Sequence, residues 1–195
     1  ALAINKRLAQ ANPQAYEPVL AISYRSLADL YFNTNRFSES EELYKSALAI
    51  NKRLAQANPQ AYEPALAISY GSLANLYYNT QRFSESEELY KSALVINKRL
   101  AQANPQAYEP ALAISYGSLA NLYYNTQRFS ESEAMHKQAL EIRERLAQSN
   151  PQAYEPDLAQ SYNSLANLYS NTQRFSESEE LYKLALEIYE RLAQS

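Results

Sequence analysis

The fold is decided by residues 59–104, which read PQAYEPALAISYGSLANLYYNTQRFSESEELYKSALVINKRLAQAN. The opening motif Asn-Pro-Gln-Ala-Tyr-Glu-Pro begins at four asparagines spaced 46 residues apart: Asn12, Asn58, Asn104 and Asn150. Phenylalanine recurs at the same step, as Phe37, Phe83, Phe129 and Phe175. Self-similarity at a fixed period is the signature of a repeat architecture, so the chain is an array of near-identical units.

We divide the array into a partial unit followed by four repeats. Ala1–Pro13 matches Ala47–Pro59 at every position, so residues 1–12 correspond to the end of a unit. The full repeats are then residues 13–58, 59–104, 105–150 and 151–195. Because the chain starts partway through a unit, we expect it to be a fragment of a longer array.

Each repeat contains a first helix, which we call helix A. In the second repeat its apolar residues recur at steps of four, three and four, as Leu66, Tyr70, Leu73 and Tyr77, which is typical of one helix face. The pattern ends at residues 79–82. The start stays open, because Pro64 suits a first helical turn and Pro59 suits one with Asn58 as N-cap.

A second helix, which we call helix B, follows in each repeat. Ser84 and Glu87 fit a capping box in which Ser84 caps the helix and Glu87 reaches back. We therefore expect helix B to run from there to about Asn104, with Leu89, Ala93, Ile96 and Leu100 on its apolar face. One hairpin cannot bury both faces, whereas stacked copies can. The sequence predicts an all-α fold, a right-handed α-solenoid of stacked antiparallel helical hairpins.

Composition excludes most catalytic chemistry. Cys and Trp are absent, Gly occurs at positions 71 and 117, and His136 is the one histidine, whereas the chain has 18 tyrosines. Thiol chemistry, cysteine-ligated metals and glycine-rich phosphate loops are excluded by this inventory. His136 occupies a slot that holds tyrosine in the other repeats, which indicates a packing substitution. We expect no enzyme, no metal and no cofactor.

The charge and hydropathy of the chain limit the classes of partner that it can bind. The net charge is −3 with both signs interspersed, which gives no electrostatic footprint for nucleic acid or an anionic membrane. No apolar run approaches the roughly 18 residues that span a bilayer, and no signal peptide opens the chain. We expect a cytoplasmic protein whose partners are proteins or peptides.

The unit resembles the tetratricopeptide repeat, particularly the long form found in kinesin light chains and bacterial signalling proteins. The resemblance is carried by Tyr70, Leu73, Ala74, Tyr77, Phe83, Tyr90, Ala93 and Leu94. It implies that the two alanines let helices A and B approach closely and that the tyrosines fill the remaining gaps. This chain departs from the family at Gln81, where the family usually has Gly, and at Ser86, where it has Ala.

A second stripe of helix A lies off the core stripe, and in the tetratricopeptide family it lines a concave groove that receives an extended peptide or a partner helix. The candidate groove residues are Ile22, Arg25, Asp29, Phe32, Asn33, Ile68, Asn75, Tyr78, Asn79, Ile114, Asn121, Tyr124, Asn125, Asn163, Asn167 and Asn171. They include two ladders, an upper one at 29/75/121/167 and a lower one at 33/79/125/171. An Asn amide can donate and accept at once, which suits a peptide backbone. The lower ladder lies near the end of helix A, where Asn often caps a helix, so part of its role is structural.

Two functions follow from this pattern. The first is a non-catalytic scaffold that binds a protein or peptide, as part of a larger signalling or scaffold protein. Since Arg25 is opposed by Asp29 one turn later, a strongly acidic ligand is disfavoured. The alternative is a structural or self-assembling array, natural or engineered. It is favoured by the apolar last helix, with Leu184 and Tyr189 at positions polar elsewhere, which predicts head-to-tail self-association.

Overall fold

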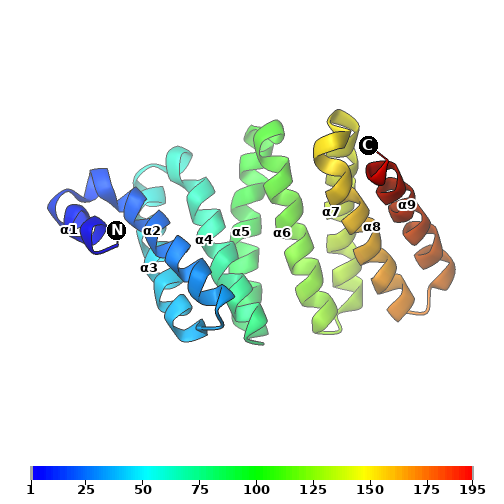
Figure 1. Cartoon of the computed structure of the whole chain (residues 1–195), viewed down its shortest axis with the longest axis horizontal. Coiled ribbons are helices and arrows are strands. Elements are labelled where there is room, and N and C mark those ends of the chain that lie inside the picture. Colours follow the sequence, from blue (N-terminus) through cyan, green and yellow to red (C-terminus); the bar gives the residue numbers. More distant parts are fainter. Residues whose placement is uncertain (1, 195) are drawn as a thin grey trace. The chain divides into compact units, whose positions relative to one another are not determined.

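The computed structural model describes residues 2–194, and over that range it is built of α-helices joined by short turns (Figure 1). The A helices are α2 (Pro13–Asn33), α4 (Pro59–Asn79), α6 (Pro105–Asn125) and α8 (Pro151–Asn171). The B helices are α3 (Phe37–Ala57), α5 (Phe83–Ala103), α7 (Phe129–Ser149) and α9 (Phe175–Ala193), and α1 (Leu2–Ala11) corresponds to the end of a B helix. The predicted all-α fold of stacked helical hairpins is confirmed.

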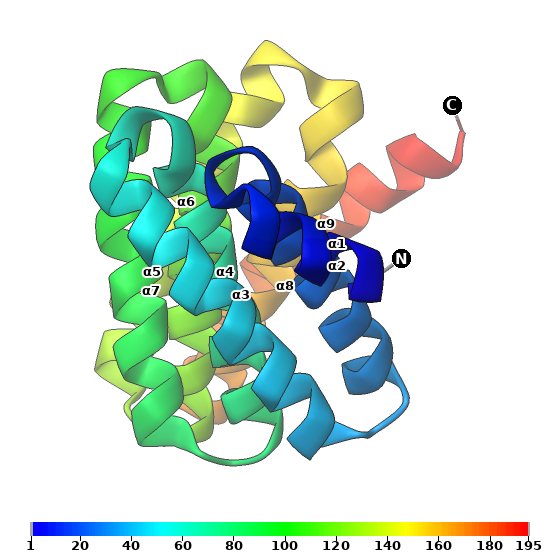
Figure 2. The same ribbon diagram turned by 90° about the vertical axis from the view of Figure 1, so that its left-hand side faces the viewer.

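The helices group into two units, one ending at Ile96 and the other starting at Asn97, so the boundary falls inside α5. In the first unit α1 packs on α2, α2 on α3 and α3 on α4. Figure 2 shows the short α1 beside α2. In the second unit α6 packs on α7, α7 on α8 and α8 on α9. Each A helix therefore contacts the B helix of its own hairpin and, at a repeat junction, the preceding B helix.

Each A helix begins at the first proline of its motif, which settles the start that the sequence left open. The Asn12 side-chain Oδ1 accepts a hydrogen bond from the Ala15 backbone N–H at 3.2 Å, and Asn58 does the same for Ala61. Proline is tolerated at the first position because an N–H there would have no partner within the helix. The second proline, Pro64 in α4, lies inside the helix.

The turn between helices A and B contains a residue with left-handed backbone. Gln81 has φ of 60°, and its N–H donates to the Tyr78 carbonyl at 3.1 Å. The Arg82 N–H donates to the Tyr77 carbonyl at 2.8 Å. Together these bonds form a Schellman motif, which satisfies carbonyls at the end of α4. The same conformation recurs at Asn35, Gln127 and Gln173. Glycine would adopt it without steric cost, so these side chains reduce stability.

The predicted capping box of helix B is wrong. Helix α5 begins at Phe83, so Ser84 lies inside the first turn. In the equivalent helix α3 the N-cap residue is Arg36, whose side chain makes no capping hydrogen bond and pairs with Glu39 instead. In α3 a single residue, Arg36, lies between the left-handed Asn35 and the first helical residue. The N-cap position is therefore occupied by arginine and not by serine.

Small buried residues bring the two helices of a hairpin together. Ala28 and Ala74 have no exposed surface. The Ser40 hydroxyl donates to the Ala28 carbonyl at 2.9 Å, and Ser86 donates to the Ala74 carbonyl at the same distance. Larger side chains fill the first unit's core, namely Tyr44, Leu48, Leu73, Leu76 and Tyr77. The predicted division between small and bulky core residues is therefore present in the structure, and the serine adds a buried hydrogen bond.

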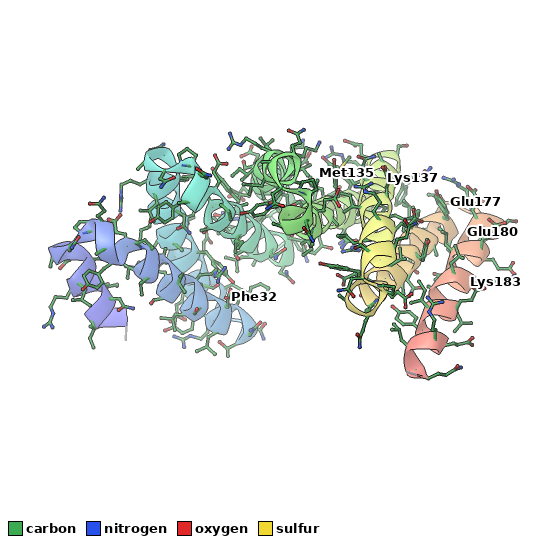
Figure 3. The ribbon with its side chains drawn as sticks, turned by 90° about the horizontal axis from the view of Figure 1, so that it is seen from above. Phe32, Met135, Lys137, Glu177, Glu180 and Lys183 are labelled. Carbon is green, nitrogen blue, oxygen red and sulfur yellow. The ribbon has the colours of Figure 1, made fainter. Side chains whose placement is uncertain are left out.

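A polar cluster joins consecutive repeats within each unit. Glu41 on α3 accepts a hydrogen bond from the Tyr77 hydroxyl at 3.0 Å and pairs with Arg82 at 2.8 Å and Lys45 at 2.7 Å. Burial opposes ionisation, but these donors hold the pKa of Glu41 below its ordinary value. In the second unit the same places are taken by Glu133, Tyr169, Arg174 and Lys137, the last labelled in Figure 3.

Candidate functional site

The A helices leave apolar side chains uncovered beside a pocket between α2 and α4. Ile22 is 57% exposed and Ile68 is 50% exposed, although both are large apolar residues. Arg25 is half-buried at the same pocket, which has a volume of about 330 Å³. Its floor is Asn51, whose Nδ2 donates to the Ser69 hydroxyl at 2.7 Å. We call this the isoleucine pocket; it is an apolar recess with a hydrogen-bonded floor.

A second pocket between α2 and α4 lies nearer the ends of these helices. It has a volume of about 240 Å³ and is lined by Asp29, Phe32, Asn33, Tyr44, Ser72 and Asn75. We call it the tyrosine pocket. Four predicted groove residues therefore meet here, and three others meet in the isoleucine pocket.

The upper ladder is held by tyrosines of the B helices. The Tyr44 hydroxyl donates to Asp29 Oδ1 at 2.5 Å, and the Tyr182 hydroxyl donates to Asn167 Oδ1 at 2.6 Å. The Tyr90 hydroxyl donates to Asn75 Oδ1 in the same way. Burial and the adjacent Asp29 carboxylate raise the pKa of Tyr44 above its ordinary value. The side-chain oxygen of these ladder residues is therefore occupied, so Asn75 and Asn167 offer a ligand their N–H donors.

The lower ladder turns back onto its own helix. Asn79 Nδ2 donates to the Asn75 carbonyl at 2.8 Å, and Asn171 Nδ2 donates to the Asn167 carbonyl at 2.9 Å. Each of these asparagines is the last residue of its helix, and the C-cap is the following residue, such as Thr80. The interpretation of the lower ladder as C-caps is thus wrong, but its amides do serve helix ends.

The aromatic candidates pack against the start of helix B. Phe32, labelled in Figure 3, lies with its ring centroid 5.9 Å from that of Phe37 in an edge-on arrangement. Tyr78 meets Phe83 at 6.0 Å in the same manner, and Tyr124 meets Phe129 at 5.9 Å. Burial raises the pKa of Tyr78. These half-buried rings secure the turn, and Phe32 also borders the tyrosine pocket.

A pocket of about 240 Å³ lies between α6 and α8, and we call it the α6/α8 pocket. Its lining residues are Ile114, Gly117, Ser118, Asn121, His136, Arg143, Asp157, Gln160 and Ser164. Ile114 and Asn121 are predicted groove residues, whereas Arg143 and Asp157 were missed and His136 was assigned to packing alone. The signal that could have found them is the departure of this junction from the other repeats. The remaining candidates line none of these three pockets: Tyr78, Asn79, Tyr124, Asn125, Asn163, Asn167 and Asn171.

Within residues 2–194, no group of three His, Cys, Asp or Glu side chains is arranged to hold a metal ion. Over the same residues, no helix combines the length and the apolar character needed to cross a membrane.

Stacked helical hairpins with pockets along their first helices define a helical repeat scaffold. Family models described as tetratricopeptide repeat match residues 65–145, 112–191 and 20–60. The chain belongs to the tetratricopeptide repeat family, whose repeats are known protein-interaction scaffolds and typically lack catalytic activity. A search of curated protein sequences found no match.

Several solved structures are similar to the chain. BtubC (BKLC) from P. vanneervenii is 26% identical with a TM-score of 0.80, and the match covers 96% of this chain and 70% of that one. The nearly identical TPR-like repeats of a putative kinesin light chain from Podosopora anserina are 22% identical with a TM-score of 0.68, covering 100% and 88%. The apo form of RapI is 13% identical with a TM-score of 0.76, covering 97% and 61%. The last two similarities show the fold alone.

Proposed function

We propose that this chain is a non-catalytic scaffold module that binds a protein or an extended peptide along its A helices, within a larger signalling or scaffold protein. The observation that carries the proposal is the exposure of Ile22, Ile68 and Ile114, at 57, 50 and 59%, in pockets that also contain amide side chains. Apolar recesses with a few convergent polar groups are typical of binding sites. Membership of a family of interaction scaffolds supports the same function.

The chemistry of these surfaces suits an extended peptide. Such a peptide presents backbone carbonyls along its length and side chains on alternate sides. Asn75 and Asn167 would donate from Nδ2 to those carbonyls, because tyrosine hydroxyls already occupy their oxygens. Ile22 and Ile68 would contact an apolar side chain. No strongly acidic ligand is expected at α2, because Asp29 follows Arg25 by one turn.

The first repeat supplies the design of the decisive variant. At the position of Asn75 it has Asp29, which accepts a hydrogen bond from Tyr44 as Asn75 does from Tyr90. Asn75→Asp therefore keeps the acceptor and removes the N–H donors. Asn75→Ala is a poorer test, because it also removes the acceptor of the hydrogen bond from the Tyr90 hydroxyl and costs stability.

The experiment compares wild type with an Asn75→Asp/Asn167→Asp double variant against a displayed library of random peptides. We expect wild type to enrich a set of peptides, and the variant to bind them about tenfold more weakly for each amide lost. Circular dichroism should show unchanged helicity. Equal binding by both proteins, or no peptide enriched by wild type, would refute the proposed groove.

A second candidate function is end-to-end self-association, and the exposure of repeat-equivalent leucines favours it. Leu30 on α2 is 56% exposed, whereas Leu76 and Leu168 at the same position are each 1% exposed. Leu186 on α9 is 55% exposed, whereas its counterpart Leu48 is 6% exposed. A second copy would cover both surfaces by continuing the stack.

Sedimentation velocity over a wide range of concentrations tests this candidate. We expect the mean mass to rise with concentration in wild type and to stay at the monomer value in a Leu186→Glu variant. A Val95→Glu change serves as the control for an added charge and lost apolar area, since Val95 on α5 is 67% exposed. Monomeric wild type throughout would refute self-association.

A further inference from the structure

The α6/α8 pocket is where the third and fourth repeats depart most from the others. Six of its lining residues differ from their counterparts at the junction of the first two repeats, and at four of these positions the earlier repeats agree with one another. His136 stands in the place of Tyr44, Arg143 of Asn51, Asp157 of Ala65 and Gln160 of Ile68. Compared with the isoleucine pocket, which contains Arg25 and Asn51, this recess lacks the counterpart of Ile68 and has the opposite charges of Arg143 and Asp157, with changes from both α7 and α8.

Arg143 preserves a structural bond and adds a charge. Its Nη1 donates to the Ser161 hydroxyl at 2.5 Å, just as Asn51 donates to Ser69 at the earlier junction. Burial lowers the pKa of Arg143, while the nearby Asp157 carboxylate opposes that effect. A guanidinium carries five N–H donors, so most of them remain available after the bond to Ser161. The lower part of the pocket therefore presents a partly desolvated hydrogen-bond donor.

Several polar side chains in the pocket have no hydrogen-bonding partner among residues 2–194. His136 is 6% exposed and forms no hydrogen bond there, although its ring borders the pocket. Burial, together with the positive charge of Arg143, lowers the pKa of His136 to about 4, so the imidazole is neutral at pH 7. Because histidine replaces the tyrosine, Asn121 lacks the hydroxyl that occupies Asn75. Its amide is free to donate and to accept. Within residues 2–194 no fully buried side-chain nitrogen or oxygen lacks a partner, so the unpartnered groups of His136 and Asn121 reach the surface of the pocket, where a ligand can meet them.

We propose that the α6/α8 pocket binds a carboxamide side chain, that of Gln or Asn, from a peptide held along the A helices. The inference rests on the proposed function and names one of its subsites. The side-chain oxygen of the carboxamide accepts from Arg143, and its NH₂ donates to Asp157 or to a free acceptor of the lining, Asn121 or His136. One group can thereby pair with a donor and with an acceptor of the recess.

Charge and size favour a carboxamide over the other side chains. A carboxylate would gain Arg143 but meet Asp157, and a lysine would gain Asp157 but meet Arg143. An aliphatic side chain would displace water from Arg143 and Asp157 without replacing its hydrogen bonds, which is costly. The volume of about 240 Å³ is below the roughly 300–1,000 Å³ of small-molecule sites and suits one side chain.

His136 is a direct spectroscopic reporter, since the chain has no other histidine. We would titrate the protein with three capped amino acids, N-acetyl-glutamine, N-acetyl-glutamate and N-acetyl-norvaline methylamides, and follow the imidazole resonances by NMR. We expect the glutamine compound to shift these resonances, with about tenfold weaker effects from the other two. An equal or larger shift with glutamate or norvaline, or no shift with glutamine up to its solubility limit, would overturn the proposal.

A matched variant separates binding in the pocket from nonspecific effects. Arg143→Asn/Asp157→Ala restores the residues of Asn51 and Ala65, a pair that this fold already accommodates, and leaves His136 in place. The glutamine-dependent shift should disappear in this variant while its circular dichroism stays unchanged; persistence of the shift would overturn the assignment. Lys183→Gln on exposed α9, labelled in Figure 3, is the control and should shift as wild type does. Because these probes are single residues, failure here is distinct from failure of the peptide-library test.

Discussion

Acid should destabilise the folded protein by protonating His136, and the loss of unfolding free energy can be calculated from the pKa of this side chain. The imidazole is 6% exposed, and burial lowers its pKa from 6.5 to about 4. The unfolded chain therefore binds a proton at this site more readily than the folded chain does. The stabilising contribution is fully present above about pH 6.5 and is lost as the pH falls towards 4. Linkage gives a loss of about 2 kcal/mol at about pH 5 and about 3 kcal/mol once both states are protonated.

Urea unfolding followed by circular dichroism, at a series of pH values, measures this loss. Glutamates titrate in the same range, so the control is His136→Tyr, which restores the residue found in the other repeats and leaves every carboxylate in place. The difference in unfolding free energy between the two proteins should change by about 2 kcal/mol between about pH 7 and pH 5. A difference independent of pH would show that the imidazole is not held neutral by burial.

Three further predictions concern stability and are checked by the same urea unfolding at neutral pH. Gln127→Gly should raise the unfolding free energy by about 1 kcal/mol, because φ is 60° at this position; a decrease would contradict the strain argument. Asn58→Ala should cost about 1 kcal/mol through loss of the bond to the Ala61 N–H, and Asn58→Asp, which keeps the acceptor, is the control. Leu76→Ala should lower the unfolding free energy by about 2–5 kcal/mol, because Leu76 is 1% exposed. Leu30→Ala, at the equivalent position, should lower it by under about 1 kcal/mol, because Leu30 is 56% exposed; similar losses in the two variants would contradict the burial argument.

The sequence predicted the helices well because periodicity reports burial directly. The stripe containing Leu73 and Tyr77 lies in the core, at 3% and 5% exposure. Helix starts were harder, because several residues satisfied the same local rule. Ser84 and Glu87 fit a capping box, but the preceding Schellman turn places Phe83 at the first helical position. That outcome depends on how the previous helix ends, which a local pattern does not encode.

The sequence predicted where the candidate site lies on helix A, but it did not predict the hydrogen bonds and charges within that site. The stripe rule located Ile68 and Asn75 on the pocket side of helix A, because both lie on one helical face. It could not show that Tyr90 already occupies the Asn75 oxygen, since that contact joins residues on two helices. Arg143 was missed for the same reason, because it reaches the pocket from α7, a B helix. Comparing repeats with one another, position by position, identifies such residues without any structure.

The repeat-to-repeat cluster has a consequence for how such an array changes in evolution. Glu41 meets Tyr77 across 36 residues, and Glu133 meets Tyr169 across the same separation. Within each of the two units, this cluster therefore uses identical partners at an identical offset. Loss or duplication of one complete 46-residue unit would therefore keep the residues of this cluster at the same spacing. The number of repeats can thus change without loss of these contacts. A single junction, such as the one containing Arg143, can acquire a different binding chemistry by substitution while the cluster stays the same.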